Sequence, residues 1–237
     1  KIYFVASSFA VTSTGVYLGA DSSFGEYDLN TEETNLLCEL PCNAEDGYMS
    51  AIQGYTLSTY NGEIYFIGGY DYLNSAYSTK VFKYDFANSK FTDTGKDIPE
   101  PRAFGKAIQY GSKLVYAYGT NDTDSMPSFL TFDGKTWTKS SINLNSDDYS
   151  EYSFGDSKVV KVFNGNLGIG NGNVVCLGSY LYGYGDLYAY SVENDRLAKF
   201  SRCLSNSLGI AANSYMTTIA GIMVIYSVNY DEYDSPE

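Results

Sequence analysis

Hydrophobic and polar residues alternate in short runs along most of the chain, and the spacing typical of helices is nearly absent. The runs are rich in Val, Ile, Tyr, Phe and Thr, and residues such as Asn, Gly and Asp separate them. Branched and aromatic side chains pack well on a pleated sheet, and the separating residues favour tight turns. The pattern therefore predicts an all-β fold.

One apolar run recurs at a nearly constant spacing, and we name it strand b. Its copies cover residues 14–20, 62–69, 112–119, 172–178 and 221–228. When Gly19, Gly69, Gly119, Gly178 and Ser227 are taken as equivalent, the spacings are 50, 50, 59 and 49 residues. Regular self-similarity of this length indicates a tandem repeat of one supersecondary unit.

The surroundings of strand b are also repeated. A further run, strand a, begins at Lys1 and recurs at 50–60, 102–111, 152–163 and 208–216. Tight turns such as Asn61-Gly62 join strand a to strand b. After strand b, a polar connection leads to a hairpin of strands c and d, at 25–38, 80–95, 129–140 and 186–200. One repeat is therefore four short antiparallel strands.

Four-stranded sheets repeated in tandem are typical of β-propeller blades, because neighbouring blades bury the faces that one sheet leaves open. We expect a single propeller domain over 1–237, with blades at about 1–47, 48–101, 102–151 and 152–206 and a partial blade at 207–237. That makes four complete blades and half of a fifth.

The second repeat resembles the kelch repeat in three features. They are Gly68-Gly69 at the end of strand b, Tyr84-Asp85 in strand c, and Pro101-Arg102 before the next strand a. Trp137 occupies the place of the d-strand tryptophan of kelch repeats. The resemblance implies a kelch-like propeller, and such propellers generally have more blades than are counted here. We therefore expect the missing strands to come from the rest of a longer chain or from another subunit.

Composition narrows the chemistry. The chain has no histidine, which removes the commonest general base and the imidazole metal ligands. It also excludes the copper-oxidase activity that the kelch resemblance would allow. A net charge of −13 argues against a nucleic-acid partner, since phosphate would be repelled. No apolar run is long enough to span a bilayer, so we expect no membrane insertion. We expect neither a cofactor nor a metal.

Two segments resemble a catalytic motif and a phosphate-binding motif, but a structural role as a turn or a loop explains each of them better. Residues 132–138 are similar to an Asp box of sialidases, but Asp133 and Gly134 are adjacent where that motif has an intervening residue. We interpret them as a c–d turn with a packing tryptophan. The glycine-rich run 165–173 precedes no helix, so we interpret it as an insertion between strands a and b rather than a phosphate loop.

Carboxylates could still support glycoside hydrolysis, which uses a pair of them. The nearest candidate pairs are Asp122 with Asp124 and Asp147 with Asp148, and both fit the simpler interpretation of solvated loop charge. The spacing of Cys38 and Cys42 allows a disulfide across a short proline loop, but partly buried free thiols are the favoured explanation of the sparse cysteines.

The connections offer a clearer signal. In a propeller the b–c and d–a connections emerge on one face, and the loops assigned to it carry 16 of the 28 acidic residues among many tyrosines. Tyrosine beside aspartate suits sugar stacking or a basic peptide. The residues we expect to bind a ligand are Asp71, Tyr72, Tyr77, Asp122, Asp124, Tyr182, Tyr184, Asp186 and Tyr230.

The sequence therefore predicts a non-enzymatic recognition module that binds a protein partner or a glycan, with no catalytic residue assigned. Two alternatives stay open: a carbohydrate-active enzyme that uses loop carboxylates, and a structural spacer in a larger surface protein. Few Lys and Arg, with many Tyr, Asn, Ser and Gly, indicate an extracellular or cell-surface protein.

Overall fold

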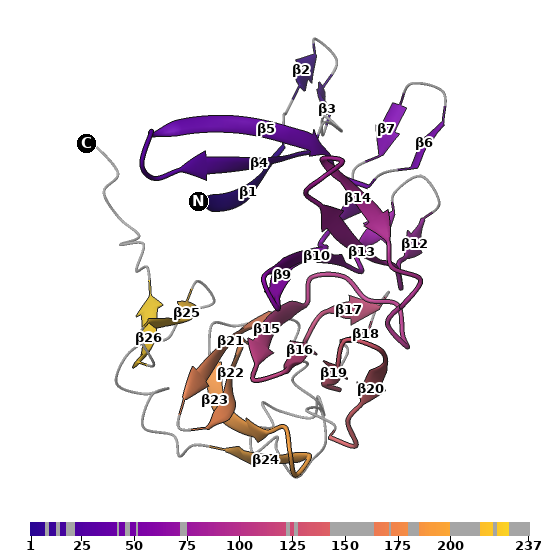
Figure 1. Cartoon of the computed structure of the whole chain (residues 1–237). Coiled ribbons are helices and arrows are strands. Elements are labelled where there is room, and N and C mark those ends of the chain that lie inside the picture. Colours follow the sequence, from indigo (N-terminus) through magenta and orange to yellow (C-terminus); the bar gives the residue numbers. More distant parts are fainter. Residues whose placement is uncertain are drawn as a thin grey trace, which may run out of the picture. The chain divides into compact units, whose positions relative to one another are not determined.

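All regular secondary structure among the residues that the computed structural model describes is β-strand, and every pair of strands is antiparallel (Figure 1). The structure describes residues 1–7, 10–12, 15–17, 22–41, 43–45, 48–50, 52–71, 75–121, 124–125, 128–142, 164–170, 172–179, 185–199, 214–219 and 222–227. The prediction of an all-β fold is confirmed. The chain divides into two compact units, Lys1–Ala103 and Phe104–Glu237, and the boundary falls close to the predicted junction of the second and third repeats.

The sheet of the second repeat has the predicted strand order. Its strands a to d are β9 (Thr56–Tyr60), β10 (Glu63–Ile67), β13 (Val81–Asp85) and β14 (Lys90–Asp93). Strand a pairs with strand b, b with c, and c with d. Asn61-Gly62 joins β9 to β10 with φ values of 52° and 77°. Such two-residue hairpins need positive φ at both positions, which Asn and Gly adopt readily.

Two sheets of the second unit repeat this order. The third repeat forms β15 (Lys106–Tyr110), β16 (Lys113–Ala117), β19 (Leu130–Phe132) and β20 (Trp137–Lys139). The fourth forms β21 (Asn164–Gly170), β22 (Asn173–Ser179), β23 (Gly185–Ser191) and β24 (Arg196–Lys199). A last hairpin, β25 (Ser214–Ile219) with β26 (Ile222–Ser227), supplies strands a and b of the fifth repeat.

The glycine-rich run 165–173 is not an insertion, so that prediction was wrong. It forms most of β21 and the turn that follows, and β21 pairs with β22 from Asn164 opposite Ser179 to Gly170 opposite Asn173. Its apolar residues still alternate, and Leu167 reaches the core. The glycines conceal this alternation because glycine is depleted in ordinary strands. The run predicted as strand a, 152–163, lies outside the described residues.

The first sheet also differs from the prediction. It contains β1 (Ile2–Ser7), β4 (Ser22–Asp28) and β5 (Glu33–Glu39), in that order. We expected Lys1 to begin strand a and residues 14–20 to form strand b. Instead, β1 pairs directly with β4, while β3 (Gly15–Tyr17) pairs with β2 (Ala10–Thr12) in a separate hairpin.

The register explains this difference, because β1 occupies the position of strand b. Tyr3 lies opposite Glu26 as Tyr65 lies opposite Lys83, one residue before the Tyr-Asp pair of strand c in both sheets. The sequence agrees, since Ile-Tyr-Phe-Val in β1 matches Ile-Tyr-Phe-Ile in β10. The β2–β3 hairpin therefore belongs to the connection between strands b and c.

Short hairpins occupy the same connection in the next two repeats. They are β11 (Tyr70–Asp71) with β12 (Ala76–Tyr77), and β17 (Thr120–Asn121) with β18 (Asp124–Ser125). β8 (Ile52–Gln53) adds a third strand to β11, and β6 (Asn43–Glu45) pairs with β7 (Tyr48–Ser50) before it in the chain. A b–c hairpin is thus a shared feature of the first three repeats.

Each unit has its own apolar core between facing sheets. In the first unit the Phe24 ring of β4 lies 4.8 Å from Tyr84 and 5.2 Å from Phe91 of the second sheet, measured between ring centroids. In the second unit Phe129 stacks on Tyr190 at 4.0 Å with an angle of 7° between the rings. Consecutive sheets therefore pack face to face within each unit, as tandem repeats require.

Candidate functional site: the connections of the second repeat

The b–c and d–a connections of the second repeat lie side by side. The N–H of Gly69 donates to the carbonyl of Arg102 at 2.9 Å, and the N–H of Arg102 donates to the carbonyl of Ser78 at 3.3 Å. These bonds tie the described residues of the b–c connection, 68–71 and 75–80, to the d–a connection, 97–102, and we call these two connections together the connection cluster. Backbone pairing gives this surface a fixed form, which a binding site on loops needs.

The glycine pair predicted as a kelch feature makes this approach possible. Gly68 and Gly69 have φ values of 65° and 108°, a region that side chains with a Cβ adopt at a cost. The third repeat has Tyr118 and Gly119 at these positions, with φ values of 62° and 96°. The third repeat therefore leaves strand b with the same backbone conformation, although Tyr118 is strained in it.

Two of the predicted binding residues lie in one small sheet of the cluster. Tyr70 pairs with both Gln53 and Tyr77, and Asp71 follows it on β11. The half-buried rings of Tyr70 and Tyr77 meet edge to face at 4.8 Å, whereas Asp71 is buried, with 7% of its surface exposed. The structure therefore adds Tyr70 to the predicted set. The alternation of aromatic and acidic residues in Tyr70-Asp71-Tyr72 was the signal for it.

Two further predicted residues lie in strands of the other unit. Asp124 lies in β18 opposite Asn121, and Asp186 lies in β23 opposite Gly178. The remaining ones, which lie outside the described residues, are Tyr72, Asp122, Tyr182, Tyr184 and Tyr230.

Arg102 anchors the d–a connection from inside. Its side chain is fully buried and forms an ion pair with Glu100, which is mostly buried as well. A guanidinium stays charged at any ordinary pH, so a buried one needs a carboxylate partner. Arg102 and Glu100 therefore hold the d–a connection in position.

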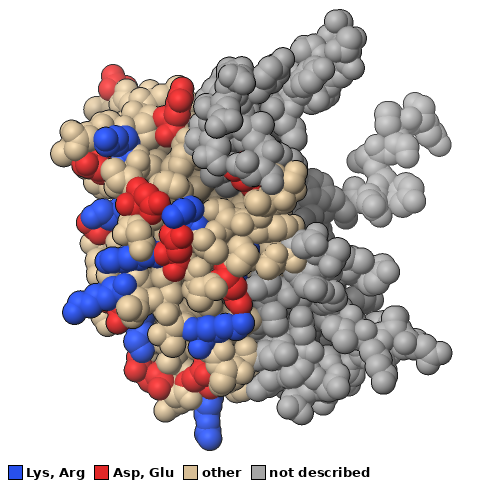
Figure 2. Space-filling model, turned by 90° about the vertical axis from the view of Figure 1, so that its right-hand side faces the viewer, with Lys and Arg blue, Asp and Glu red and all other residues tan. Residues whose placement is uncertain are grey.

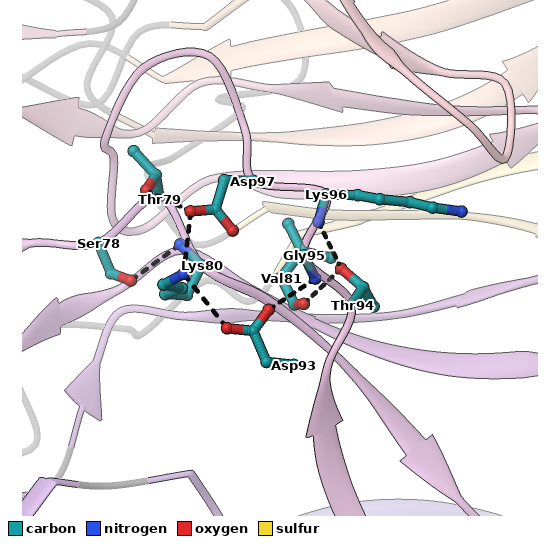
Figure 3. A network of polar contacts seen from close by, with 9 residues as sticks. All are labelled: Ser78, Thr79, Lys80, Val81, Asp93, Thr94, Gly95, Lys96 and Asp97. Atoms are coloured by element: carbon teal, nitrogen blue, oxygen red, sulfur yellow. Dashed lines mark hydrogen bonds and ion pairs between the residues drawn. The ribbon is translucent and has the colours of Figure 1, made fainter.

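Lys80 joins two carboxylates at the edge of the cluster (Figure 3). Its Nζ lies 3.2 Å from an oxygen of Asp97 and 3.2 Å from an oxygen of Asp93. Hydrogen bonds to Asp97 and Asp93 raise the pKa of Lys80. The N–H of Gly95 lowers the pKa of Asp93, with Lys80 adding to the effect. Lys80 offsets one of these two negative charges, so the group as a whole remains negative.

Charges of both signs lie next to one another on the described part of the face drawn in Figure 2. Two ion pairs lie in the first unit, where Lys83 lies 2.9 Å from Glu63 and Lys1 lies 2.6 Å from Glu26. The acidic face that the sequence predicts depends largely on connections outside the described residues.

Asp28, Asp85 and Asp133 end strand c at equivalent positions of three sheets. Each accepts a backbone N–H of the following turn, from Asn30, Ala87 and Lys135, at 2.9, 2.9 and 2.8 Å. Backbone hydrogen bonds lower the pKa of Asp28 and of Asp133, and the Asn88 side chain is the main cause of the lowered pKa of Asp85. The role of these three carboxylates is therefore to stabilise the turns between strands c and d.

The interpretation of residues 132–138 as a c–d turn is confirmed. Besides its bond to Lys135, Asp133 accepts the N–H of Thr136 at 2.8 Å, and Trp137 stacks on Phe132 at 4.9 Å. Cys38 is a half-buried free thiol whose pKa burial raises, and Cys42 lies outside the described residues. In the part of the chain that the structure describes, no group of three His, Cys, Asp or Glu residues could hold a metal ion.

Comparison with known proteins supports the fold. No protein-family model and no curated protein matches the sequence. Among solved structures, the chain is similar to the structure of YjhT, with a TM-score of 0.62 and 14% sequence identity. The similarity covers 94% of this chain and 72% of that one, and at this identity it concerns the fold alone. Among the described residues, none forms a helix long and apolar enough to cross a membrane.

Proposed function

We propose that this chain is a kelch-like β-propeller module, or part of one, that recognises a protein or a glycan outside the cell or at its surface. The tandem four-stranded sheets, stacked face to face within each unit, support the propeller. The glycine pair and the Tyr84-Asp85 pair of the second repeat support the kelch-like assignment.

The observation that carries the binding function is the connection cluster. Backbone hydrogen bonds hold its two segments together, and the Tyr70 and Tyr77 rings meet there while both stay half exposed. A fixed pair of tyrosines offers apolar ring surface and hydroxyl groups at a low cost in conformational entropy. That chemistry suits a sugar ring or the side chains of a basic peptide.

The acids around the cluster favour recognition over catalysis. A glycosidase needs a carboxylic acid whose pKa is raised so that it stays protonated. Asp93 has a lowered pKa and an ion pair with Lys80, and Glu100 is held by Arg102. These carboxylates hold the connections in place.

The test is to screen the full chain on a glycan array and on an array of basic peptides. For any ligand found, we expect Tyr77→Ala to weaken binding about tenfold or more, the range of an aromatic contact at the centre of an interface. Phe86→Ala is the matched control, because Phe86 is also a half-exposed aromatic residue but follows strand c at the c–d turn.

Two results would contradict this function. Hydrolysis of an array glycan by the chain would support the carbohydrate-active enzyme instead. Absence of any ligand on both arrays, with a folded protein by circular dichroism, would support the structural spacer.

A further inference from the structure

Tyr70 and Tyr77 lie directly opposite each other in the b–c hairpin of the second repeat. β11 and β12 pair antiparallel there, with Tyr70 opposite Tyr77 and Asp71 opposite Ala76. Residues that are opposite in such a pair have side chains on the same face, with Cβ atoms about 5 Å apart. The two rings meet at 4.8 Å between centroids, with 63° between their planes. Both residues belong to the first unit, so pairing within that unit sets the contact.

Backbone hydrogen bonds hold the chain on both sides of this tyrosine pair. The N–H of Ser78, which follows Tyr77, donates to the carbonyl of Gly69, which precedes Tyr70, at 2.8 Å. Arg102 bonds to both of these residues, since it accepts the N–H of Gly69 and donates its own N–H to Ser78. Each of the three residues is thus bonded to the other two. The backbone that carries the two tyrosines is fixed, and the rings are kept next to each other.

Two phenol rings held in contact are suited to oxidative coupling. A phenolic O–H that loses one electron and one proton becomes a phenoxyl radical, whose unpaired electron is shared with the ring carbons ortho to the oxygen. Two such radicals combine by forming a carbon–carbon bond between their ortho carbons. The hydrogen on each of these carbons then moves to the phenoxyl oxygen, which restores both aromatic rings and both hydroxyl groups. The coupled product is dityrosine.

We propose that Tyr70 and Tyr77 are a modification site, at which a haem peroxidase with hydrogen peroxide joins the two rings into dityrosine. The pair loses two electrons and two protons in total, and these reduce one hydrogen peroxide to two water molecules. The new bond closes a covalent loop over residues 70–77 and ties β11 to β12. This inference does not rest on the proposed function, because the coupling needs only the two rings and the oxidant.

A second tyrosine pair of the same repeat is less suited to this reaction. The ring centroids of Tyr60 and Tyr65 are 6.0 Å apart, and the residue opposite Tyr60 is Glu63 rather than Tyr65. Both rings are buried, whereas Tyr70 and Tyr77 are half buried. Burial, together with a hydrogen bond to Glu63, raises the pKa of Tyr65 to about 12, so its proton is lost less readily. Distance, register and burial therefore all favour Tyr70 with Tyr77.

Peptide mapping tests the proposal without any ligand. The folded chain is oxidised at low concentration with a plant peroxidase and hydrogen peroxide, and then cleaved before its aspartates. This cleavage places Tyr70 in the peptide 46–70 and Tyr77 in the peptide 71–84. We expect one product in which the two peptides are joined, with a mass two hydrogens below their sum. Fragmentation in the mass spectrometer should locate the bond at Tyr70 and Tyr77.

Two variants and one condition serve as controls. Tyr77→Phe keeps the ring but removes the phenol, and we expect it to abolish the product. Tyr65→Phe is the matched control, because Tyr65 lies in the same peptide as Tyr70, and the product should form as in the wild type. Urea should reduce the yield strongly, since unfolding separates the paired strands.

Three results would overturn the proposal. They are the absence of a joined product from the folded chain, a product of the same yield in Tyr77→Phe, and a yield in urea equal to that of the folded chain. The last would show that closeness in the sequence, rather than the pairing of β11 with β12, brings the rings together. In the coupled product we also expect slower amide hydrogen exchange at residues 68–71 and 75–80, because the cross-link limits opening of the hairpin.

Discussion

Asp195 occupies the turn between β23 and β24, where it binds the segment that follows β20. Its carboxylate accepts the N–H of Ser141 at 2.8 Å, the Ser141 hydroxyl at 2.7 Å and the Tyr190 hydroxyl at 2.9 Å. Burial alone would raise the pKa of Asp195, but these hydrogen bonds lower it overall. One side chain thus links the third sheet to the fourth, and no sequence motif marks it.

We expect Asp195→Asn to lower the free energy of unfolding by about 1 kcal/mol at neutral pH, because hydrogen bonds to a charged acceptor are replaced by weaker ones. Asparagine tolerates the positive φ of 46° at this position, so the backbone is not strained. Because the folded state lowers the pKa of Asp195, its contribution is complete above the unfolded pKa near ~4 and is lost as the pH falls through the folded value.

Denaturant unfolding at pH 7 and at pH 3 provides the measurement. The wild type should lose more stability than Asp195→Asn between these two values. Glu193→Gln is the control, since Glu193 is exposed and lies 3.5 Å from Lys113. Equal pH dependence in all three proteins would show that Asp195 has no such role.

Gly105 is fixed by the ring that covers it. A Cβ added at this position would lie 2.4 Å from the Cζ of Tyr116, which is fully buried. We expect Gly105→Ala to cost about 1–3 kcal/mol, the usual range for overpacking. Combining it with Tyr116→Leu should recover part of that loss in thermal unfolding. Additive losses in the double variant would argue against the clash.

At the scale of elements, β1 and β21 show where sequence reasoning succeeded and failed. Sheet order follows the sequence wherever alternation is regular, as in β9 to β14. The match between residues 2–5 and 64–67 was present in the sequence and identifies β1 as strand b. β1 was assigned to strand a because it is the first apolar run of the chain. β21 was assigned to an insertion because its glycines hide the alternating apolar residues by which a strand is recognised.

The Lys80 network is expected to contribute little to stability. The side chains of Lys80, Asp93 and Asp97 are each more than a third exposed, and ion pairs of this kind are screened by solvent and salt. Lys80→Met should therefore leave the denaturant midpoint unchanged within error, at low and at high salt. Val81→Ala on the same strand is the contrast, with an expected loss of about 1–3 kcal/mol because Val81 is fully buried. A large, salt-sensitive loss in Lys80→Met would contradict this view.

At the scale of the whole molecule, two cores stabilise two units. The first is centred on Phe24, Phe66 and Tyr84, and the second on Phe129 and Tyr190. Each core lies between consecutive sheets, so the loss of one aromatic residue should be felt most by the sheets that share it.

We expect Phe129→Ala to destabilise the Phe104–Glu237 unit by about 3–5 kcal/mol, because it leaves a cavity against Tyr190. Hydrogen exchange followed by mass spectrometry should show faster exchange in β16 and β22, with β10 of the other unit protected as before. An equal increase in all three strands would show that the units unfold as one.

The binding site was predictable in part. Tyr77 and Asp71 were selected from the sequence because they follow strand b, and the structure places them in one small sheet with Tyr70. The burial of Asp71 and the ion pair between Glu100 and the fully buried Arg102 could not be predicted, because packing that the local sequence does not show decides which side chains are buried. The sequence shows that a loop is acidic, but it does not show which side chain or backbone group each acid binds in the folded chain.

The sequence by itself determined the all-β class, the four-strand repeat and the positions of most strands, because alternation and turn residues act locally. Only the tertiary structure decided that β1 takes the place of strand b and that several acids are paired or bound in turns. Each of these depends on which strand or connection lies alongside another, and residues distant in the sequence make that choice through packing and hydrogen bonding.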